Sequence, residues 1–363
     1  MNIPPKESEM IKNWISLASM APSGANLQPW AYSYIMANER IKFSLSICKD
    51  HLTSPSSIDP FFVAAAMGIG AFAKNLQVAA SCDGYECTML SSRGDTPQTW
   101  FWDLSFEKSS AVDLENIVLK EAIFKRVSNR HAFIKTPMLL NDWEKTLKSL
   151  NKNPNFSLIR DTANRKIWSR LLSKLESIRC NDEKFRSELF NEIRNRSEIL
   201  KEPVGLPIDT VTNSWVEKFS INILKRWSKL QVVLSFGAAY IFIQSSVKKP
   251  LINSGDILVL QSKSRQPRDS FEMGMLLEEL WLGWTKAGYS VQILALPLII
   301  LGGQSPGFKN RLSKKNINAL LEASKIGKEK LGIDLSLPTL VIRLGKAITS
   351  SPQSPRRAVL VQS

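Results

Sequence analysis

The sequence is poor in the residues that bind metals and build hydrolytic triads. It contains two histidines, His51 and His131, and four cysteines, none of which form a Cys-x-x-Cys pair. No zinc pattern can be drawn from that set, and no nucleophile, base and orienting group can be assembled from it. We therefore expect neither a metal site nor a triad hydrolase.

Long apolar runs are also scarce. The best membrane candidate, residues 230–246 (LQVVLSFGAAYIFIQSS), is shorter than the roughly 20 apolar residues of a spanning helix and includes Gln231, Ser235 and Gln244. We expect no membrane span. The opening residues, MNIPPKESEM, lack a basic segment followed by an apolar one, so the expected location is cytoplasmic, with reduced thiols.

Acidic residues are few relative to basic ones. The chain has 48 Lys and Arg against 33 Asp and Glu, which gives a formal net charge of +15 and calls for an anionic partner. A phosphate-bearing cofactor, a nucleic acid or a membrane surface would each fit. Because the basic residues are spread along the chain, with no aromatic stacking platform among them, we expect no nucleic-acid partner.

The length and the apolar pattern predict a chain of helices and strands large enough for two domains or one repeated architecture. A length of 363 residues is a little over two domains at about 150 residues each. One helix is expected before Pro22, one over 64–81 and one from Phe271. Residues 182–201 predict a charged amphipathic helix, either a lid or a solvated face. Strands are expected at 30–35, 41–47, 85–90, 100–106, 257–261 and 339–344.

Two of these helical segments share their end positions. Residues 70–85 (GAFAKNLQVAASCDGY) and 274–289 (GMLLEELWLGWTKAGY) both open on glycine and close on Gly-Tyr, with one offset, because 274 − 70 = 204 and 288 − 84 = 204. Few other positions coincide. The pattern is a weak indication of an internal duplication.

The sharpest local pattern follows the first helix. In residues 21–30 (APSGANLQPW) two prolines stiffen a loop that carries Ser23 and Asn26. Its chemistry alone suits hydrogen bonding to the polyol or ring edge of a ligand, or equally a helix-stop turn. This segment resembles the APSxxNxQPW signature of the FMN-dependent nitroreductase family. In that resemblance Pro22, Ser23, Asn26 and Gln28 would bind the flavin.

A second match lies a hundred residues further on. Residues 126–130 (RVSNR) resemble the family's RRSxR phosphate and flavin motif. By itself such a segment would read as a solvated basic loop. The resemblance implies that Arg126, Ser128, Asn129 and Arg130 contact FMN, with Arg126 at the phosphate and Arg130 near the flavin N1 and O2 atoms. An arginine suits that phosphate because its planar fork can bond two oxygens at once.

Two further segments resemble the family at later positions. Residues 337–347 (LPTLVIRLGKA) and the basic SPRR tail match its late strand and closing arginines, so Arg356 or Arg357 would reach the phosphate. Gly288, Tyr289 and Ser290, with Gln292 nearby, match the turn whose backbone N–H meets the flavin N5 atom.

The order of the motifs is similar to the Acg-like branch of the family, in which one chain is a fused, pseudo-symmetric dimer. That resemblance implies an α+β nitroreductase-like fold with two halves, 1–115 and 116–363, and a possible lid at 182–246. One flavin site would be complete and the other degenerate. The implied activity is NAD(P)H-dependent reduction of nitroaromatic, quinone-like or other small acceptors through FMN. The alternative is a flavoprotein that sequesters FMN under its lid. We expect a monomer that acts as a pseudo-dimer, with a small-molecule electron acceptor as its partner.

Overall fold

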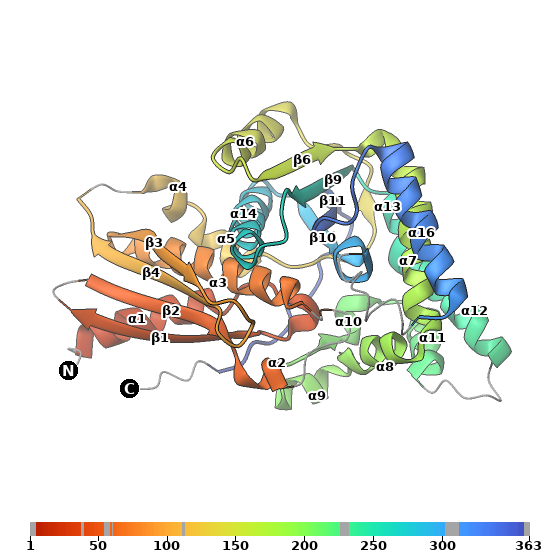
Figure 1. The fold of residues 1–363 in the computed structure, drawn as a ribbon, viewed down its shortest axis with the longest axis horizontal. Helices are drawn as coiled ribbons and strands as arrows, with labels where there is room; N and C mark the ends of the chain where they lie inside the picture. The colour runs from red at the N-terminus through yellow and green to blue at the C-terminus, as the bar shows by residue number, and fades with distance from the viewer. Residues whose placement is uncertain are drawn as a thin grey trace.

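The computed structural model describes residues 5–37, 40–53, 59, 61–110, 113–225, 232–301 and 312–358. Two antiparallel sheets lie on either side of two long helices, α3 (Val63–Cys82) and α14 (Pro267–Lys286), which pack against each other (Figure 1). Helix α3 covers the first sheet and α14 covers the second. The expected mixed α+β class is confirmed.

The first sheet has the strand order β1-β2-β4-β3 and is buried on one face only. Apolar residues alternate along its strands, so that Ile41, Phe43 and Leu45 enter the core beneath α3 while their neighbours face outward. The elements of this half are α1 (Pro5–Ala18), β1 (Trp30–Ala37), β2 (Arg40–Ile47), β3 (Tyr85–Arg93) and β4 (Phe101–Lys108), with the short helix α2 (Lys49–Thr53).

The second sheet has the order β10-β11-β9-β6, with β5 (Phe133–Ile134) paired to one end of β11. Its central strands are apolar at nearly every position because α14 covers one face and the helices α7 and α16 cover the other. The elements are α6 (Leu140–Asn151), β6 (Phe156–Arg160), β9 (Asp256–Ser262), β10 (Ser290–Leu294), β11 (Thr339–Ala347), α7 (Arg165–Asn181) and α16 (Lys314–Ile326).

The two halves repeat one topology. Each runs helix, strand, strand, long helix, strand, strand, and the orders β1-β2-β4-β3 and β6-β9-β11-β10 are equivalent. Helices α3 and α14 have 20 residues each and begin 204 positions apart, since 267 − 63 = 204. The glycines that follow them, Gly84 and Gly288, both have left-handed backbones, with φ of 78° and 81°.

The contact between the long helices is reciprocal. A Cβ atom on Gly70 would lie 1.9 Å from the Phe271 carbonyl oxygen, and one on Gly274 would lie 2.0 Å from the Met67 carbonyl oxygen. Each carbonyl belongs to the residue three positions before the opposite glycine. This is the pattern of an interface in which the same surface patch meets itself, and it needs glycine at both positions.

A long insertion between β6 and β9 distinguishes the second half. It occupies residues 161–255, begins with α7 and lies beside α16 at one end of the molecule (Figure 1). Its further elements are α8 (Glu183–Glu192), β7 (Ile193–Arg194), α9 (Arg196–Lys201), β8 (Leu206–Pro207), α10 (Ile208–Val211), α11 (Trp215–Lys225), α12 (Val232–Ile243), a π-helix (Gln244–Lys248) and α13 (Lys249–Ile252).

The expectation of one helix over 182–201 is wrong. Helix α8 ends at Glu192, strand β7 pairs in parallel with β8, and α9 starts a new helix. Asn195 and Glu198 form a capping box at the start of α9, and this local pairing competes with a continuous helix. Of the possible lid at 182–246, residues 226–231 lie outside the described residues.

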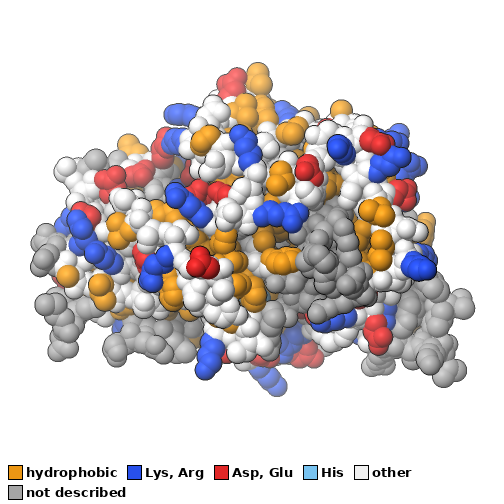
Figure 2. Space-filling model, in the orientation of Figure 1, with side chains coloured by type: hydrophobic (Ala, Val, Ile, Leu, Met, Phe, Trp, Pro, Cys, Tyr) orange, Lys and Arg blue, Asp and Glu red, His pale blue; other side chains and the backbone are white. Residues whose placement is uncertain are grey.

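Two short helices, α4 (Leu114–Ile117) and α5 (Lys120–Lys125), join the halves, and 3-10 or π turns cover Gly24–Asn26, Thr162–Asn164, Pro297–Leu301 and Gly327–Leu331. Among the described helices only α3 is long and apolar enough to span a membrane, and 83% of its apolar window is buried inside the protein, as in a core helix. Lys and Arg side chains are scattered over the face shown in Figure 2, with Asp and Glu among them.

Candidate functional site

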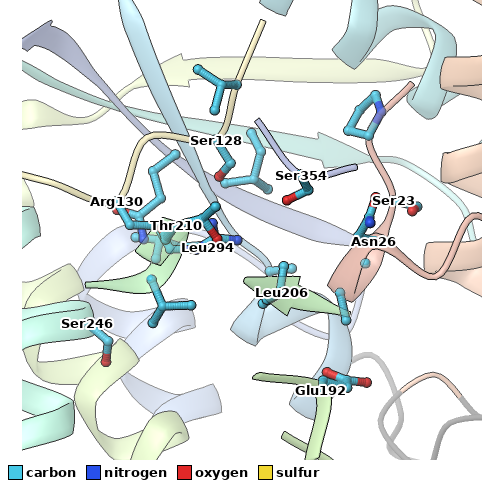
Figure 3. A pocket seen from close by; sticks show the side chains of 18 of the residues that line it. Ser23, Asn26, Ser128, Arg130, Glu192, Leu206, Thr210, Ser246, Leu294 and Ser354 are labelled. Carbon is cyan, nitrogen blue, oxygen red and sulfur yellow. Dashed lines mark hydrogen bonds between the residues drawn. The ribbon is translucent and has the colours of Figure 1, made fainter. Parts of the chain in front are cut away.

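A cavity of about 780 Å³ opens where the two halves and the insertion meet. Gly68 and Ala71 of α3 and Leu277 and Trp281 of α14 line its inner wall. Most of the remaining lining comes from the loop at 20–29, the segment 126–133, the insertion, residues 292–299 and the tail at 349–356. In Figure 3, Ser23 and Asn26 lie on one side, while Arg130, Thr210 and Ser246 lie on the other. Of the residues expected to bind a flavin, Pro22, Ser23, Asn26, Arg126, Ser128, Arg130 and Arg356 line this cavity.

The loop after α1 is a tight turn that holds the C-terminal tail. Ser23 Oγ accepts a hydrogen bond from the Gln28 backbone N–H at 2.9 Å, and Ala25, Asn26 and Gln28 all have positive φ. Asn26 donates through Nδ2 to the Pro355 carbonyl at 3.0 Å and accepts through Oδ1 from Arg356. A segment 330 residues away is thereby fixed at the cavity wall.

Gln28 and Arg357 do not line the cavity, but they are hydrogen-bonded to each other. The Gln28 carboxamide oxygen accepts from the Arg357 backbone N–H at 2.8 Å, and its nitrogen donates to the Pro203 carbonyl. Gln28 therefore joins the first half, the insertion and the tail. Of the closing pair of arginines, it is Arg356 that reaches the cavity.

Two arginines and one glutamate form a buried cluster at one end of the cavity. Arg126 Nε lies 3.0 Å from Glu278 Oε1, with both side chains almost fully buried, and its guanidinium stacks 4.8 Å from the Trp281 ring centroid. Arg126 and Arg356 both donate to the Met20 carbonyl oxygen. Because one carboxylate faces two guanidinium groups, this end of the cavity carries excess positive charge.

Burial and mutual repulsion shape the ionisation of this cluster. Burial, together with the charge of Arg126, lowers the pKa of Arg356 to about 9. Burial likewise raises the pKa of Glu278, although Arg126 opposes that rise. The Nε atom of Arg356 is buried and donates to no acceptor among the described residues. An anion placed here would relieve both the repulsion and the missing hydrogen bond.

Arg130 lies apart from that cluster, on the opposite wall. Its Nη1 reaches the Thr210 carbonyl at 3.5 Å, and burial followed by the charge of Arg179 lowers its pKa to about 10. Arg179 itself is held by both oxygens of Glu176, at 2.6 and 2.8 Å. Of these two arginines, Arg130 is thus the one whose charge is available to a ligand.

Asn129 is buried in a structural role between Ser128 and Arg130. Its backbone N–H donates to the Val291 carbonyl at 2.8 Å, its Nδ2 donates to the Thr349 carbonyl at 2.8 Å, and its Oδ1 accepts from the His131 backbone N–H at 2.9 Å. These bonds fix the 126–133 segment so that the side chains on either side of Asn129 reach the cavity.

The turn at 288–290 does not line the cavity. Gly288 terminates α14, the Tyr289 hydroxyl donates to Asp142 at 3.0 Å and accepts from the Leu139 N–H, and Ser290 pairs with Gly345. The nearest residue of this strand that does reach the cavity is Gln292.

Further titratable residues line the cavity outside the matched motifs, among them His131, which directly follows the RVSNR segment. His131 faces the cavity, and burial lowers its pKa; Asp59 caps the start of α3, and burial raises its pKa to about 6. Glu192, at the end of α8, also faces the cavity, and burial raises its pKa to about 7 (Figure 3). No motif marks Glu192, because its approach to the cavity depends on how the insertion folds back over the halves.

A second, small pocket occupies the equivalent place on the other side of the long helices. Its volume is about 100 Å³, and its lining includes Gln77, Glu272 and Met275. Subtracting or adding 204 relates these positions to Trp281, Gly68 and Ala71 of the large cavity. Among the described residues we find no group of three or more His, Cys, Asp or Glu that could hold a metal ion.

No family model matches the chain, and no curated protein matches its sequence. Several solved structures overlap with it loosely. The FMN-dependent nitroreductase NfnB from Mycobacterium smegmatis, solved with NADPH, is 13% identical, covers 66% of this chain and 94% of its own, and has a TM-score of 0.37. A BluB-like flavoprotein from Clostridium difficile is 14% identical over 66% and 94%, with a TM-score of 0.35. Iodotyrosine deiodinase, solved with FMN and 3-iodo-L-tyrosine, is 16% identical over 67% and 97%, with a TM-score of 0.34. These overlaps are too loose to assign a function, which rests on the chain's own residues.

Proposed function

We propose that this protein is an FMN-binding oxidoreductase of the nitroreductase kind, with two fused, pseudo-symmetric halves and one flavin site per chain. The observation that carries the proposal is a convergence. The APSGANLQPW loop, the RVSNR segment and the SPRR tail, which are far apart in the sequence, meet at one cavity beside the long helices.

The residues of the cavity fit FMN. Arg126 and Arg356 bring more positive charge than Glu278 neutralises, and Arg356 keeps one buried donor without an acceptor among the described residues. That end suits a phosphate monoester, which carries a charge of about −1.5 to −2 near pH 7. Leu277 and Trp281 supply apolar surface for a ring system, and Arg130 places a cation on the opposite wall. The volume also leaves room for a small second ligand.

In this proposal the protein supplies binding and charge. FMN, when bound, would take a hydride from NADH or NADPH and pass the electrons to a nitroaromatic, quinone-like or other small organic acceptor. Arg126 and Arg356 hold the phosphate, Ser23, Asn26 and Ser128 orient the ribityl and ring portions, and Arg130 stabilises negative charge on the reduced ring. The insertion lines one side of the cavity and limits the entry of water.

The duplicated topology supports a monomer that contains both halves of a family dimer. The boundaries we propose are 1–115 and 116–363, and we propose a cytoplasmic location. Because the second pocket is only about 100 Å³, it cannot hold a flavin, so each chain should bind one FMN.

The experiment that tests this proposal is reconstitution with flavin. The purified chain is incubated with FMN and desalted, and the bound flavin is quantified from its visible spectrum against protein concentration, alongside the molar mass in solution. One FMN per monomer supports the proposal. A protein that stays colourless contradicts it, and two FMN per chain contradict the degenerate second site.

A second candidate function, FMN sequestration with little turnover, is favoured by the extent to which the insertion encloses the cavity. Residues from α7 through α13 line it, among them Glu192, Thr210 and Ser246 (Figure 3). A cover of this kind could keep a nicotinamide from the flavin. Anaerobic addition of NADH or NADPH separates the two functions: rapid bleaching of the flavin supports the oxidoreductase, whereas bleaching by dithionite alone supports sequestration.

A further inference from the structure

Arg343 and Gln292 form a buried pair beside the cavity. They are directly opposite each other on β11 and β10 and therefore lie on the same face of the second sheet. Arg343 Nη1 donates to Gln292 Oε1 at 2.6 Å, Nη2 donates to the His131 carbonyl, and the guanidinium stacks 3.6 Å from the Phe133 ring centroid. Arg343 is fully buried.

This contact fixes the orientation of the Gln292 carboxamide. A guanidinium has only donors, so the glutamine atom that it holds must be the oxygen. The Nε2 amino group is the remaining end of a side chain that lines the cavity. It donates to no acceptor among the described residues, so its two N–H groups are available to a ligand.

Arg343 also differs from two other buried arginines beside the cavity, Arg126 and Arg179. Arg126 has Glu278 and Arg179 has Glu176, whereas no carboxylate in the described part of the chain lies within ion-pair distance of Arg343. Burial lowers the pKa of Arg343 to about 9. An unpaired buried cation is costly to fold, and its retention beside a cavity points to a role toward a bound ligand.

We propose that Arg343 is a positioning residue that holds the Gln292 amide with its N–H groups toward the cavity, where Gln292 donates to a hydrogen-bond acceptor on the ring edge of the bound flavin. The inference rests on the proposed function. It assigns the pair to the ring and not to the phosphate, because the excess positive charge of Arg126 and Arg356 forms a separate cluster.

The test measures the dissociation constants of FMN and of riboflavin, which lacks the phosphate, by quenching of flavin fluorescence. Gln292→Glu replaces the donor with an acceptor of the same shape. It should weaken the binding of both ligands at least about tenfold, the usual effect of one lost hydrogen bond at a buried site. Arg343→Met should weaken the binding of both flavins to a similar extent. In a protein that already carries Gln292→Met, the further change Arg343→Met should weaken binding by less than about twofold, because Arg343 acts through Gln292.

Each outcome decides between the alternatives. If Gln292→Glu binds both flavins as the wild-type protein does, the amide oxygen faces the ligand and the inference is overturned. If Arg343→Met weakens flavin binding by the same factor in the wild-type protein and in Gln292→Met, the inference is overturned as well. If Arg343→Met fails to fold by circular dichroism, Gln292→Glu decides, because it leaves the buried Arg343 side chain in place. A wild-type protein that binds neither flavin contradicts the proposed function itself.

Discussion

The two pockets beside the long helices occupy equivalent places, yet one has a volume of about 780 Å³ and the other about 100 Å³. Side-chain size at matched positions accounts for part of the difference, and the insertion, which lines only the large cavity, accounts for another part. Gly68 and Ala71 leave the inner wall of the large cavity open, whereas Glu272 and Met275, 204 residues later, fill the small one. The same helix pair can therefore build a ligand site on one side and a packed surface on the other.

The two pockets also differ in the balance of charge around them. At the large cavity, Glu278 of α14 faces two arginines, so positive charge is in excess. The equivalent position on α3 is Lys74, because 278 − 204 = 74, and it forms a 2.9 Å ion pair with Glu279 and a hydrogen bond to Asn116. The small pocket is electrically satisfied by the protein alone, and only the large one calls for an anionic ligand.

Exchanging the size of the matched residues should give the largest effect. Ala71→Met places at the large cavity the side chain that fills the small one. It should weaken FMN binding by more than about 100-fold, since the added atoms occupy the ligand volume. The measurement is a fluorescence titration with FMN. Met275→Ala is the matched control: it should leave one FMN per chain. Normal FMN affinity in Ala71→Met would place the flavin elsewhere.

The reciprocal helix contact predicts the next effect, on folding stability. Gly274→Ala should lower the free energy of unfolding by about 3 kcal/mol, because the new Cβ would lie 2.0 Å from the Met67 carbonyl oxygen. Gly70→Ala should cost a similar amount. Chemical denaturation measures both.

Gly283→Ala, on the same helix α14, is the control for the helix contact. A Cβ there meets no atom within 4 Å, so this substitution should stabilise the protein by about 0.5–1 kcal/mol. If all three substitutions have equal effects, the close approach of the two helices is absent and the pseudo-symmetric interface is incorrect.

Much of the fold was predictable because it depends on local periodicity. The strand at Arg40–Ile47 follows from a two-residue alternation and the two long helices from a 3.6-residue period, whereas the strand at Asp256–Ser262 follows from a short continuous apolar run. The shared offset of Gly70 and Gly274 also proved informative, because only glycine permits that approach of the two helices.

The site was predictable only in part. Asn26, Arg126 and Arg356 each belong to a recognisable motif, and all three line the cavity; their contact with a flavin stays a prediction. Gly288 was selected for the same reason, but it lies at a helix end away from the cavity. Glu192 and Thr210 had no motif, since their approach to the site depends on nonlocal packing of the insertion.

Removing a phosphate contact should have a smaller effect than closing the cavity. Arg356→Gln should weaken FMN binding by about 10- to 100-fold through the loss of a charge-assisted bond, with the affinity for riboflavin little changed. Parallel titrations with the two ligands measure the contrast. Arg357→Gln is the matched control, because only the backbone of Arg357 bonds to Gln28. An equal loss for FMN and riboflavin would move Arg356 away from the phosphate.

The smallest expected effect compares an acid of the large cavity with one of the small pocket. Burial raises the pKa of Glu192 to about 7 from its ordinary value of 4.5, so between those pH values the folded protein binds more protons than the unfolded chain. Wild-type stability should therefore fall as the pH rises through this range. Glu192→Gln should be more stable than wild type by about 1 kcal/mol at pH 8, and the difference should vanish near pH 4.5. Glu279→Gln should have the opposite sign at pH 8, because it removes the ion pair with Lys74. Urea denaturation at both pH values measures the pair, and a Glu192→Gln advantage that persists at pH 4.5 would mean that it does not come from the carboxylate charge.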